Sequence, residues 1–88
     1  SMKFEKILTL DIWGNEITKI EEEVCKSLSF LKKLDARNNK IKDISVHIKA
    51  MMQLQILRLD HNEISNLPLE IGDLQLLVEL SFSDNKVS

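Results

Sequence analysis

The chain has 88 residues, which is the length of one domain or of part of one. A hydrophobic fraction of 43% and a charged fraction of 30% are typical of a folded, soluble domain and exclude disordered and collagen-like chains. Twelve basic and 14 acidic residues give a net charge of −2, so electrostatic binding of nucleic acid is not expected. No apolar run approaches the roughly 20 residues of a membrane-spanning helix, so membrane insertion is not expected either.

The two ends of the chain point to an excised fragment of a longer protein. Ser1 and Met2 read like a cloning remnant, and no apolar segment of a signal peptide follows them. Residues 84–88 contain no signal that would end an element. We therefore expect a piece of a larger array that lacks capping units.

Cysteine usage gives an expectation about the cellular compartment. Cys25 is the single cysteine, which excludes an internal disulfide and a cysteine-based zinc site. The chain also lacks the Asn-x-Ser/Thr sequence of N-glycosylation. A cytoplasmic, intracellular localisation is therefore predicted, with Cys25 as a half-buried filler rather than a reactive thiol.

An internal repeat dominates the sequence. Four asparagines recur at intervals of 24, 23 and 23 residues, and the residues eight, five and three places before each of them are apolar. The residue two places after each asparagine is apolar as well. The asparagines are Asn15, Asn39, Asn62 and Asn85, and the apolar triplets before them are Ile7, Leu10, Ile12; Leu31, Leu34, Ala36; Leu54, Leu57, Leu59; and Leu77, Leu80, Phe82.

Each unit is expected to run from a strand through a turn to a helical segment. In the first unit, apolar and polar residues alternate over residues 10–13, which predicts a short strand with one buried face. Acidic residues 21–23 then suit a helix start, where the helix dipole favours negative charge. In the third unit, Ile71, Leu74 and Leu77 follow at helical spacing, and Pro68 suits the first helical turn.

The repeated asparagines are expected to form a structural ladder where the chain leaves each strand. A side-chain amide both donates and accepts, so asparagines in register can bond the backbone groups of the turns. Leucine in their place would leave those groups unpaired, at about 1–3 kcal/mol for each group. Ala36 stands where the other units carry a larger apolar residue, so a local dent is expected there and Ala36→Leu is expected to raise the melting temperature.

The pattern L-x-x-L-x-L-x-x-N-x-L resembles the leucine-rich repeat family over essentially the whole chain. Residues 54–64 show it best, and the length and tail of this unit resemble the typical intracellular-style subclass. The resemblance implies an α/β fold, a right-handed solenoid or short horseshoe with a parallel sheet on its concave face and short helices or 3-10 turns on its convex face. We expect a single domain over 1–88, with a partial first repeat at 1–17 and further repeats at 18–41, 42–64 and 65–88.

The concave face is the candidate binding surface. Its residues alternate with the core leucines along each strand, and neighbouring strands lie about 4.8 Å apart, so residues in one column can touch. Trp13 is the most informative, because an exposed tryptophan is either a binding hot spot or a position covered by a cap or an earlier repeat. The residues expected to bind a partner are Thr9, Asp11, Trp13, Lys33, Asp35, Arg37, Ile56, Arg58 and Asp60.

Charged residues on this face are expected to interact with one another. By register, Arg37 lies between Trp13 and Asp60, where a cation–π contact and an ion pair are both feasible. Arg58 is expected to reach Asp35. The pairs are expected to form a self-satisfied surface lattice, worth about 0–1 kcal/mol for each exposed pair, and such a lattice is compatible with a docking surface.

No constellation for catalysis, metal binding or cofactor binding is found in the sequence. By register, His47 belongs to the convex side and His61 to a strand exit, and neither can pair with Cys25 as a base with its nucleophile. Gly14 and Gly72 are the only glycines, so no glycine-rich phosphate loop exists. We expect no catalytic residue, metal or cofactor.

The sequence therefore predicts a protein–protein interaction module, a scaffold or adaptor whose concave sheet binds an unidentified protein partner. The alternative is a regulatory or targeting segment of a larger kinase, phosphatase, cyclase or deadenylase, since similar arrays are attached to such enzymes. Because the ends expose apolar core and strand edges, self-association through the ends or edges is also predicted at high concentration.

Overall fold

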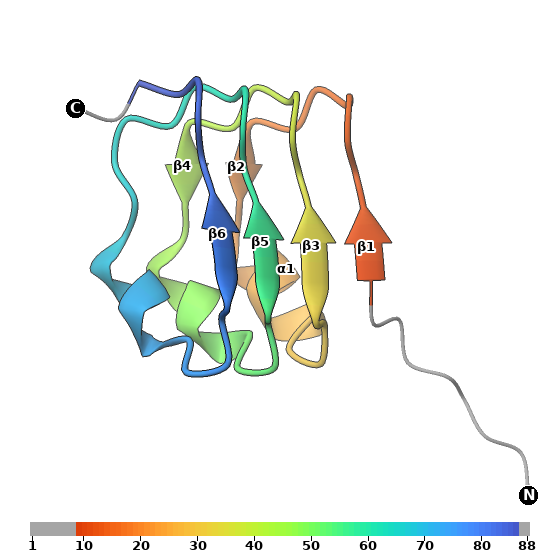
Figure 1. The fold of residues 1–88 in the computed structure, drawn as a ribbon, viewed down its shortest axis with the longest axis vertical. Helices are drawn as coiled ribbons and strands as arrows, with labels where there is room; N and C mark the ends of the chain where they lie inside the picture. Colours follow the sequence, from red (N-terminus) through yellow and green to blue (C-terminus); the bar gives the residue numbers. More distant parts are fainter. Residues whose placement is uncertain (1–8, 87–88) are drawn as a thin grey trace, which may run out of the picture.

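The computed structural model describes residues 9–86 as a stack of similar coils (Figure 1). Each coil contributes one short strand to a parallel sheet in which strands that follow one another along the stack pair directly. The register places Leu10, Leu34, Leu57 and Leu80 side by side, so equivalent residues of each unit form continuous columns. The strands are β1 (Thr9–Asp11), β3 (Lys33–Asp35), β5 (Ile56–Arg58) and β6 (Glu79–Ser81).

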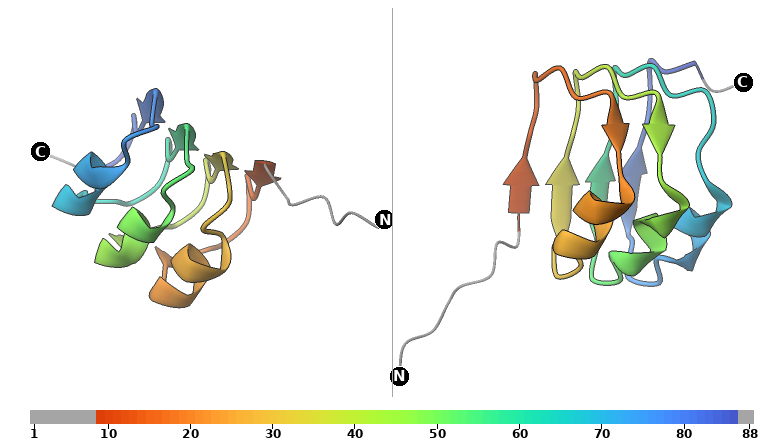
Figure 2. Two further views of the ribbon diagram at one scale, coloured as in Figure 1. Left: turned by 90° about the horizontal axis from the view of Figure 1, so that it is seen from below. Right: turned by 180° about the vertical axis from the view of Figure 1, so that it is seen from behind.

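Short helices cover the side of the stack opposite the sheet. Figure 2 shows the coils fanning so that the sheet lies on the inner side of the curve and the helices lie on the outer side. Two further strands, β2 (Lys19–Ile20) and β4 (Asp43–Ile44), pair in parallel on the helix side of the stack (Figure 2). The helices are α1 (Glu22–Ser27) and the 3-10 helices η1 (Val46–Ala50) and η2 (Leu69–Asp73). The structure thus confirms the expected α/β solenoid with its concave sheet.

The apolar positions of the repeat meet in one core between the sheet and the helices. Leu57 and Leu59 in the central coil have no exposed surface, and Leu34 is 2% exposed. Their counterparts in the outer coils, Leu10 and Leu80, are only partly buried because each has a neighbouring coil on one side alone. The pattern also assigns Ile7 and Val87 to the core, but both lie outside the described residues.

Asn62 shows how the asparagine ladder works. Its side-chain nitrogen donates to the carbonyl oxygens of Leu59 at 2.9 Å, Ala36 at 3.0 Å and Asp60 at 3.2 Å. Its side-chain oxygen accepts the amide of Ile41 at 3.0 Å. This side chain, which is 7% exposed, therefore makes two hydrogen bonds within its own coil and two to the preceding coil.

Asn39 and Asn85 follow the same plan, and Asn15 differs from it. Asn39 bonds to its own coil and to the carbonyl of Ile12 in the preceding coil at 3.0 Å. Asn85 in turn reaches back to the carbonyl of Leu59 at 2.9 Å. Asn15, in the first described coil, donates only to its own coil, to the Ile12 carbonyl at 2.8 Å. Asn39, Asn62 and Asn85 thus each make four hydrogen bonds across two coils, whereas Asn15 makes one bond within its own coil.

A column of left-handed residues stands directly before the asparagines, and the sequence analysis did not predict it. Asn38, His61 and Asp84 have φ angles of 59°, 60° and 56°, and Gly14 has 78°. This conformation turns the chain sharply out of the sheet and brings the next residue, the asparagine, toward the core. Glycine, asparagine, aspartate and histidine are the residue types that adopt it most readily, which is the signal that could have revealed it.

Two local expectations have different outcomes. Pro68 is not in the first turn of η2 but directly before it, with extended backbone at φ −66° and ψ 143°. That position fits proline, because its fixed φ suits the approach to a helix and its missing N–H breaks no bond. Ala36 has no exposed surface; the dent expected beside it, and the effect of Ala36→Leu, stay predictions.

Candidate protein-binding surface

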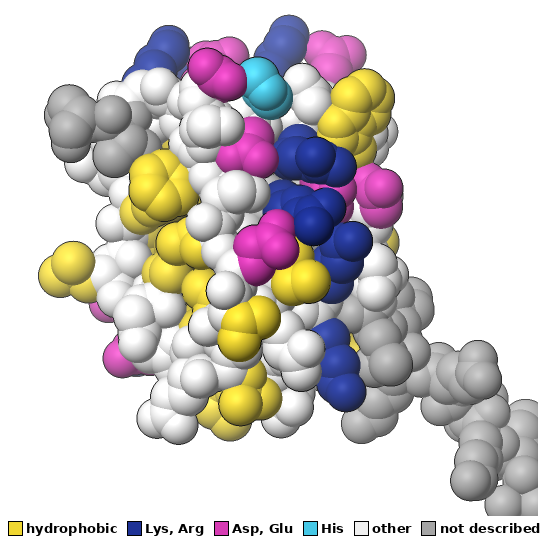
Figure 3. Space-filling model, viewed as in Figure 1, with side chains coloured by type: hydrophobic (Ala, Val, Ile, Leu, Met, Phe, Trp, Pro, Cys, Tyr) yellow, Lys and Arg dark blue, Asp and Glu magenta, His cyan; other side chains and the backbone are white. Residues whose placement is uncertain are grey.

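The sheet side of the stack presents a face rich in charged residues with a tryptophan at one end. Figure 3 shows basic side chains running down the middle of this face, with acidic groups on either side and apolar groups toward the edge of the stack. The side chains come from alternate positions of the strands and from the residues that follow them. The parallel register therefore holds them on a rigid backbone rather than on loops.

Asp35 and Arg37 form the most ordered pair on this face. The guanidinium donates two bonds to the carboxylate, from Nε to Oδ1 at 2.8 Å and from Nη2 to Oδ2 at 2.7 Å. The Arg37 side chain is the main reason why the pKa of Asp35 lies below its ordinary value of 3.8; burial opposes this lowering, and the charge of Arg58 adds to it. Asp35 is only 3% exposed, so it acts as the buried anchor of Arg37 rather than as a free docking group.

The pairing of the two arginines differs from the expectation. Arg37, which follows β3, pairs with Asp35 at the end of that strand and not with Asp60, because a partner two residues away in extended backbone is within bidentate reach. Arg58 pairs with Glu79 of β6 at 2.8 Å and not with Asp35, whose oxygens are already occupied by Arg37. The arginines of this face are therefore largely self-neutralised.

Asp11 and Asp60 also have partners, which are backbone groups. Asp11 accepts the amide of Trp13 at 2.9 Å, and this bond fixes the turn that carries the tryptophan. Asp60 accepts the amide of Ser83 at 2.7 Å and its hydroxyl at 3.1 Å. Burial raises the pKa of Asp60, but the bonds from Ser83 and the charge of Arg37 outweigh it and leave that pKa below its ordinary value. These carboxylates therefore fix the backbone beneath the surface without the help of a partner.

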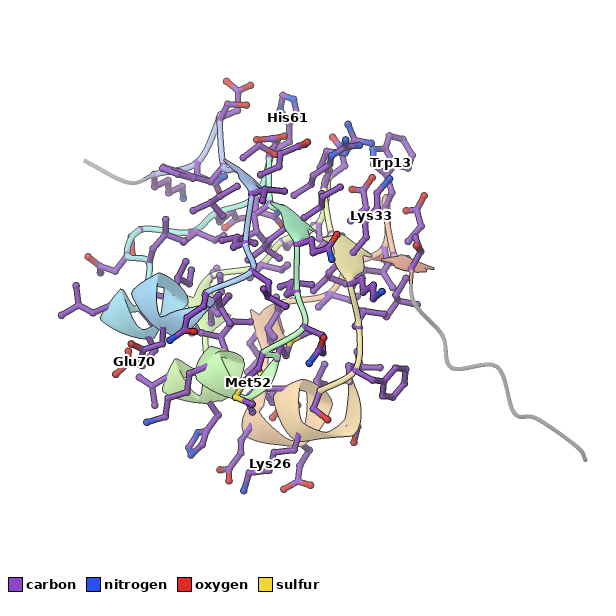
Figure 4. All side chains as sticks on the ribbon, turned by 60° about the horizontal axis from the view of Figure 1, so that its bottom comes forward. Trp13, Lys26, Lys33, Met52, His61 and Glu70 are labelled. Carbon is purple, nitrogen blue, oxygen red and sulfur yellow. The ribbon has the colours of Figure 1, made fainter. Side chains whose placement is uncertain are left out.

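Trp13 and Lys33 are the groups on this face that are available to a partner. Trp13 is 55% exposed, so the described residues leave more than half of its surface uncovered. Lys33 forms no ion pair with any residue between 9 and 86, and it lies beside Thr9 and Ile56 in the sheet. Figure 4 shows Trp13 and Lys33 on the sheet side of the molecule, away from Lys26 and Glu70 on the helices.

The residues considered for catalysis lie apart from one another. His47 belongs to η1, where its ring contacts Ser45 at 3.1 Å, whereas His61 lies at a strand exit beside Asp84 at 3.2 Å. Cys25 is fully buried in α1, and this burial raises the pKa of its thiol. Within residues 9–86, no three His, Cys, Asp or Glu side chains are grouped closely enough to hold a metal ion.

A hollow lies away from the sheet face, at the turns that join helices to strands. Its volume is about 330 Å³, and Met52, Gln53, Asp73, Gln75 and Leu76 line it. Met52 is 63% exposed and Leu76 is 45% exposed. The hollow combines apolar and amide groups with one carboxylate, and it is distant from Trp13 along the coil.

Comparison with known proteins agrees with this geometry. The family model for the leucine rich repeat matches residues 6–64, so the chain belongs to the leucine-rich repeat family. The chain is similar to osteomodulin from Bos taurus, with 29% identity over 86 residues, which are 97% of this chain and 20% of that protein. The chain thus spans about one fifth of the length of this relative. Proteins of this family generally bind protein partners, and the chain is a repeat module of that kind.

No helix within the described part of the chain combines the length and the apolar character that spanning a membrane requires.

Proposed function

We propose that this chain is a scaffold or adaptor module that binds a protein partner on its concave sheet, with Trp13 as the main anchor. The observation that carries the proposal is the 55% exposure of this side chain on a hydrogen-bonded sheet face. Tryptophan is enriched among the residues that dominate binding energy, because a large apolar surface is removed from water at little cost in side-chain entropy.

The backbone beneath the surface supports this role. The turn of Trp13 is fixed by the carboxylate of Asp11 and by the bond from the Gly14 amide to the Arg37 carbonyl at 3.1 Å. A face that is ordered before binding loses little conformational freedom when a partner docks. The side chains can therefore differ from one protein to another while the scaffold stays the same.

The charges on this face favour a contact led by the apolar anchor. Arg37 and Arg58 are each paired with a carboxylate, so a partner must replace those bonds before it can use either guanidinium. Lys33 lies next to Ile56 in the sheet and offers an ammonium beside an apolar side chain. A partner that places one apolar group against Trp13, another against Ile56 and an acceptor near Lys33 would fit best.

The same surface would serve a repeat segment that targets a larger enzyme, and no feature of the described residues favours that alternative. An intracellular setting is part of the proposal, and the single cysteine is compatible with it.

Affinity capture with three matched baits tests the proposal. The baits are the unaltered chain, a sheet-face variant with Trp13→Ala and Lys33→Ala, and a helix-face control with Val46→Ala and Lys49→Ala. Each variant removes one exposed apolar side chain and one lysine; Val46 is 49% exposed, close to the 55% of Trp13.

We expect a protein that the unaltered chain and the helix-face control retain, and that the sheet-face variant loses by at least tenfold. Equal loss from both variants would contradict a concave binding face. Loss from the helix-face control alone would move the binding surface to the helices.

A further inference from the structure

The hollow at the turns between helices and strands is formed by two successive coils. Met52 and Gln53 belong to one coil, and Asp73, Gln75 and Leu76 belong to the next. Both of its walls are therefore described parts of the stack. Its volume of about 330 Å³ is at the lower end of the range of ligand pockets, roughly 300–1,000 Å³, and suits one or two side chains of a binding partner.

The fold itself holds Met52 and Gln53 at the tip of a turn. Their neighbours on either side, Met51 and Leu54, are fully buried, and the Leu54 amide donates to the Met51 carbonyl at 3.1 Å. The two residues between these anchors are therefore exposed, although described coils lie on both sides of them. The turn of the next coil, residues 74–77, is closed by the equivalent bond at 3.1 Å.

The repeat does not require apolar side chains at these tips. Gln75 stands at the repeat position of Met52, ten places before an asparagine, and Gln53 stands at the position of Leu76, nine places before one. Apolar and amide side chains thus alternate between the two walls of the hollow. A single exposed apolar side chain needs no explanation, whereas two that line one hollow indicate a contact surface.

Asp73 is the one charged residue among the five that line the hollow. It is exposed, and it forms no ion pair with any residue between 9 and 86. At the end of η2 a carboxylate gains nothing from the helix dipole, which favours cations there, and the preceding coil carries Ala50 at the same repeat position. The hollow therefore offers a free carboxylate to a cation, and a guanidinium matches a carboxylate best because it can donate two parallel bonds.

We propose that this hollow binds a short extended segment of a partner protein that carries an apolar residue and an arginine two places apart. Side chains two places apart lie on the same face of an extended chain. The apolar side chain enters between Met52 and Leu76, and the arginine pairs with Asp73. The side-chain amides of Gln53 and Gln75 bond the main chain of the segment, since an amide both donates and accepts.

This site is separate from the concave face. Figure 4 shows Met52 on the same side of the molecule as Lys26 and Glu70 of the helices, whereas Trp13 and Lys33 lie on the sheet side. Variants of one surface therefore leave the other intact, and failure of either proposal does not bear on the other.

Titration with short peptides tests the proposal. Blocked peptides Gly-X-Gly-Arg-Gly, with Leu, Met or Phe at X, are added to the chain labelled with ¹³C in its methionine methyl groups. The methyl signal of Met52, assigned with Met52→Leu, should shift saturably below about 10 mM for at least one peptide, and the indole signal of Trp13 should stay in place. Replacing the arginine of the best peptide with glutamate should weaken binding about two- to fivefold, the range of an exposed ion pair.

Reversing the charge of the hollow provides the second arm. Asp73→Lys should make the glutamate peptide bind more tightly than the arginine peptide. Asp43→Lys is the matched control, because Asp43 is an exposed carboxylate of β4 outside the hollow, and it should leave the preference for arginine unaltered. Circular dichroism checks that both variants fold; if either does not, the comparison of the two peptides on the unaltered chain decides.

Four results would overturn the proposal. They are peptides that leave the Met52 signal in place, equal binding of the arginine and glutamate peptides to the unaltered chain, and the same change of preference in Asp73→Lys and Asp43→Lys. The fourth is acetylarginine amide binding as tightly as the best peptide, because the hollow would then bind a cation alone and not a peptide segment.

Discussion

The side chain of Asn62 holds the backbones of two central coils together. It is 7% exposed and makes four hydrogen bonds with backbone groups of two coils. Asn62→Ala would leave several buried backbone groups unpaired, so we expect a loss of about 2–4 kcal/mol in the free energy of unfolding. Urea denaturation followed by circular dichroism measures it.

Asn66→Ala is the matched control for that change. Asn66 is exposed, and its side chain makes only a 3.4 Å contact with Ser65. Its substitution should change the free energy of unfolding by no more than about 0.5 kcal/mol. Equal losses in the free energy of unfolding at both positions would show that the buried asparagine of the ladder stabilises the fold no more than an exposed asparagine does.

Asp35 makes the stability of the fold depend on pH in the acidic range. Its pKa in the folded chain is lowered, chiefly by the Arg37 side chain, from an ordinary value of 3.8. The ionised carboxylate therefore stabilises the folded state above that value, and this contribution is lost as the pH falls through the folded pKa. Asp35→Asn should lower stability at neutral pH and flatten its decline below about pH 4.

Denaturation midpoints measured from pH 7 to pH 2 check this prediction, with Asp43→Asn on the exposed edge of β4 as the control. Asp60, whose pKa is also lowered, should leave part of the acid dependence in place. An unaltered slope in Asp35→Asn would contradict the role assigned to the Asp35–Arg37 pair.

At the scale of single residues, the sequence predicted where a residue lies better than which side chain it pairs with. The asparagine spacing located the ladder, because backbone groups at a strand exit need a fixed amide partner in every coil. The pairing of Arg37 could not be predicted, since Asp35 and Asp60 are both within reach in the register and only the side-chain conformation selects between them. The left-handed residues before the asparagines were overlooked, although their types favour that conformation.

At the scale of elements, the position of a coil in the stack should decide the cost of removing its core leucine. Leu57 in β5 has coils on both sides and no exposed surface, whereas Leu80 in β6 has one neighbouring strand and is partly buried. We expect Leu57→Ala to cost about 2–5 kcal/mol and Leu80→Ala less than half as much. Chemical denaturation at concentrations too low for self-association compares them, and equal costs would contradict the order of burial.

The elements themselves were predictable to different degrees. Strand positions followed from the alternation of apolar and polar residues, and the register followed from the repeat length. The kind of helix did not: α1 is an α-helix, whereas η1 and η2 are 3-10 helices of five residues each. The unit with the α-helix is one residue longer than the others. Its asparagine spacing is 24 residues, whereas the other two spacings are 23.

At the scale of the whole molecule, the solenoid separates a sheet face from a helix face. The concave face presents an exposed tryptophan on a preordered sheet, whereas the opposite side of the stack carries the helices. Fold and candidate surface were both readable from the repeat, because every coil places equivalent residues in the same column. The identity of a partner was not readable, because it depends on the shape and charge of a second molecule.

The single tryptophan of the chain offers the most direct test of concave binding. The protein identified by affinity capture, or a segment of it that contains no tryptophan, is titrated into the chain while the emission of Trp13 and its quenching by acrylamide are recorded. Binding on the concave face should shift the emission to shorter wavelength and lower the quenching constant at least twofold, because the indole moves from water into an interface. Saturable binding that leaves both the emission and the quenching of Trp13 unchanged would contradict the account.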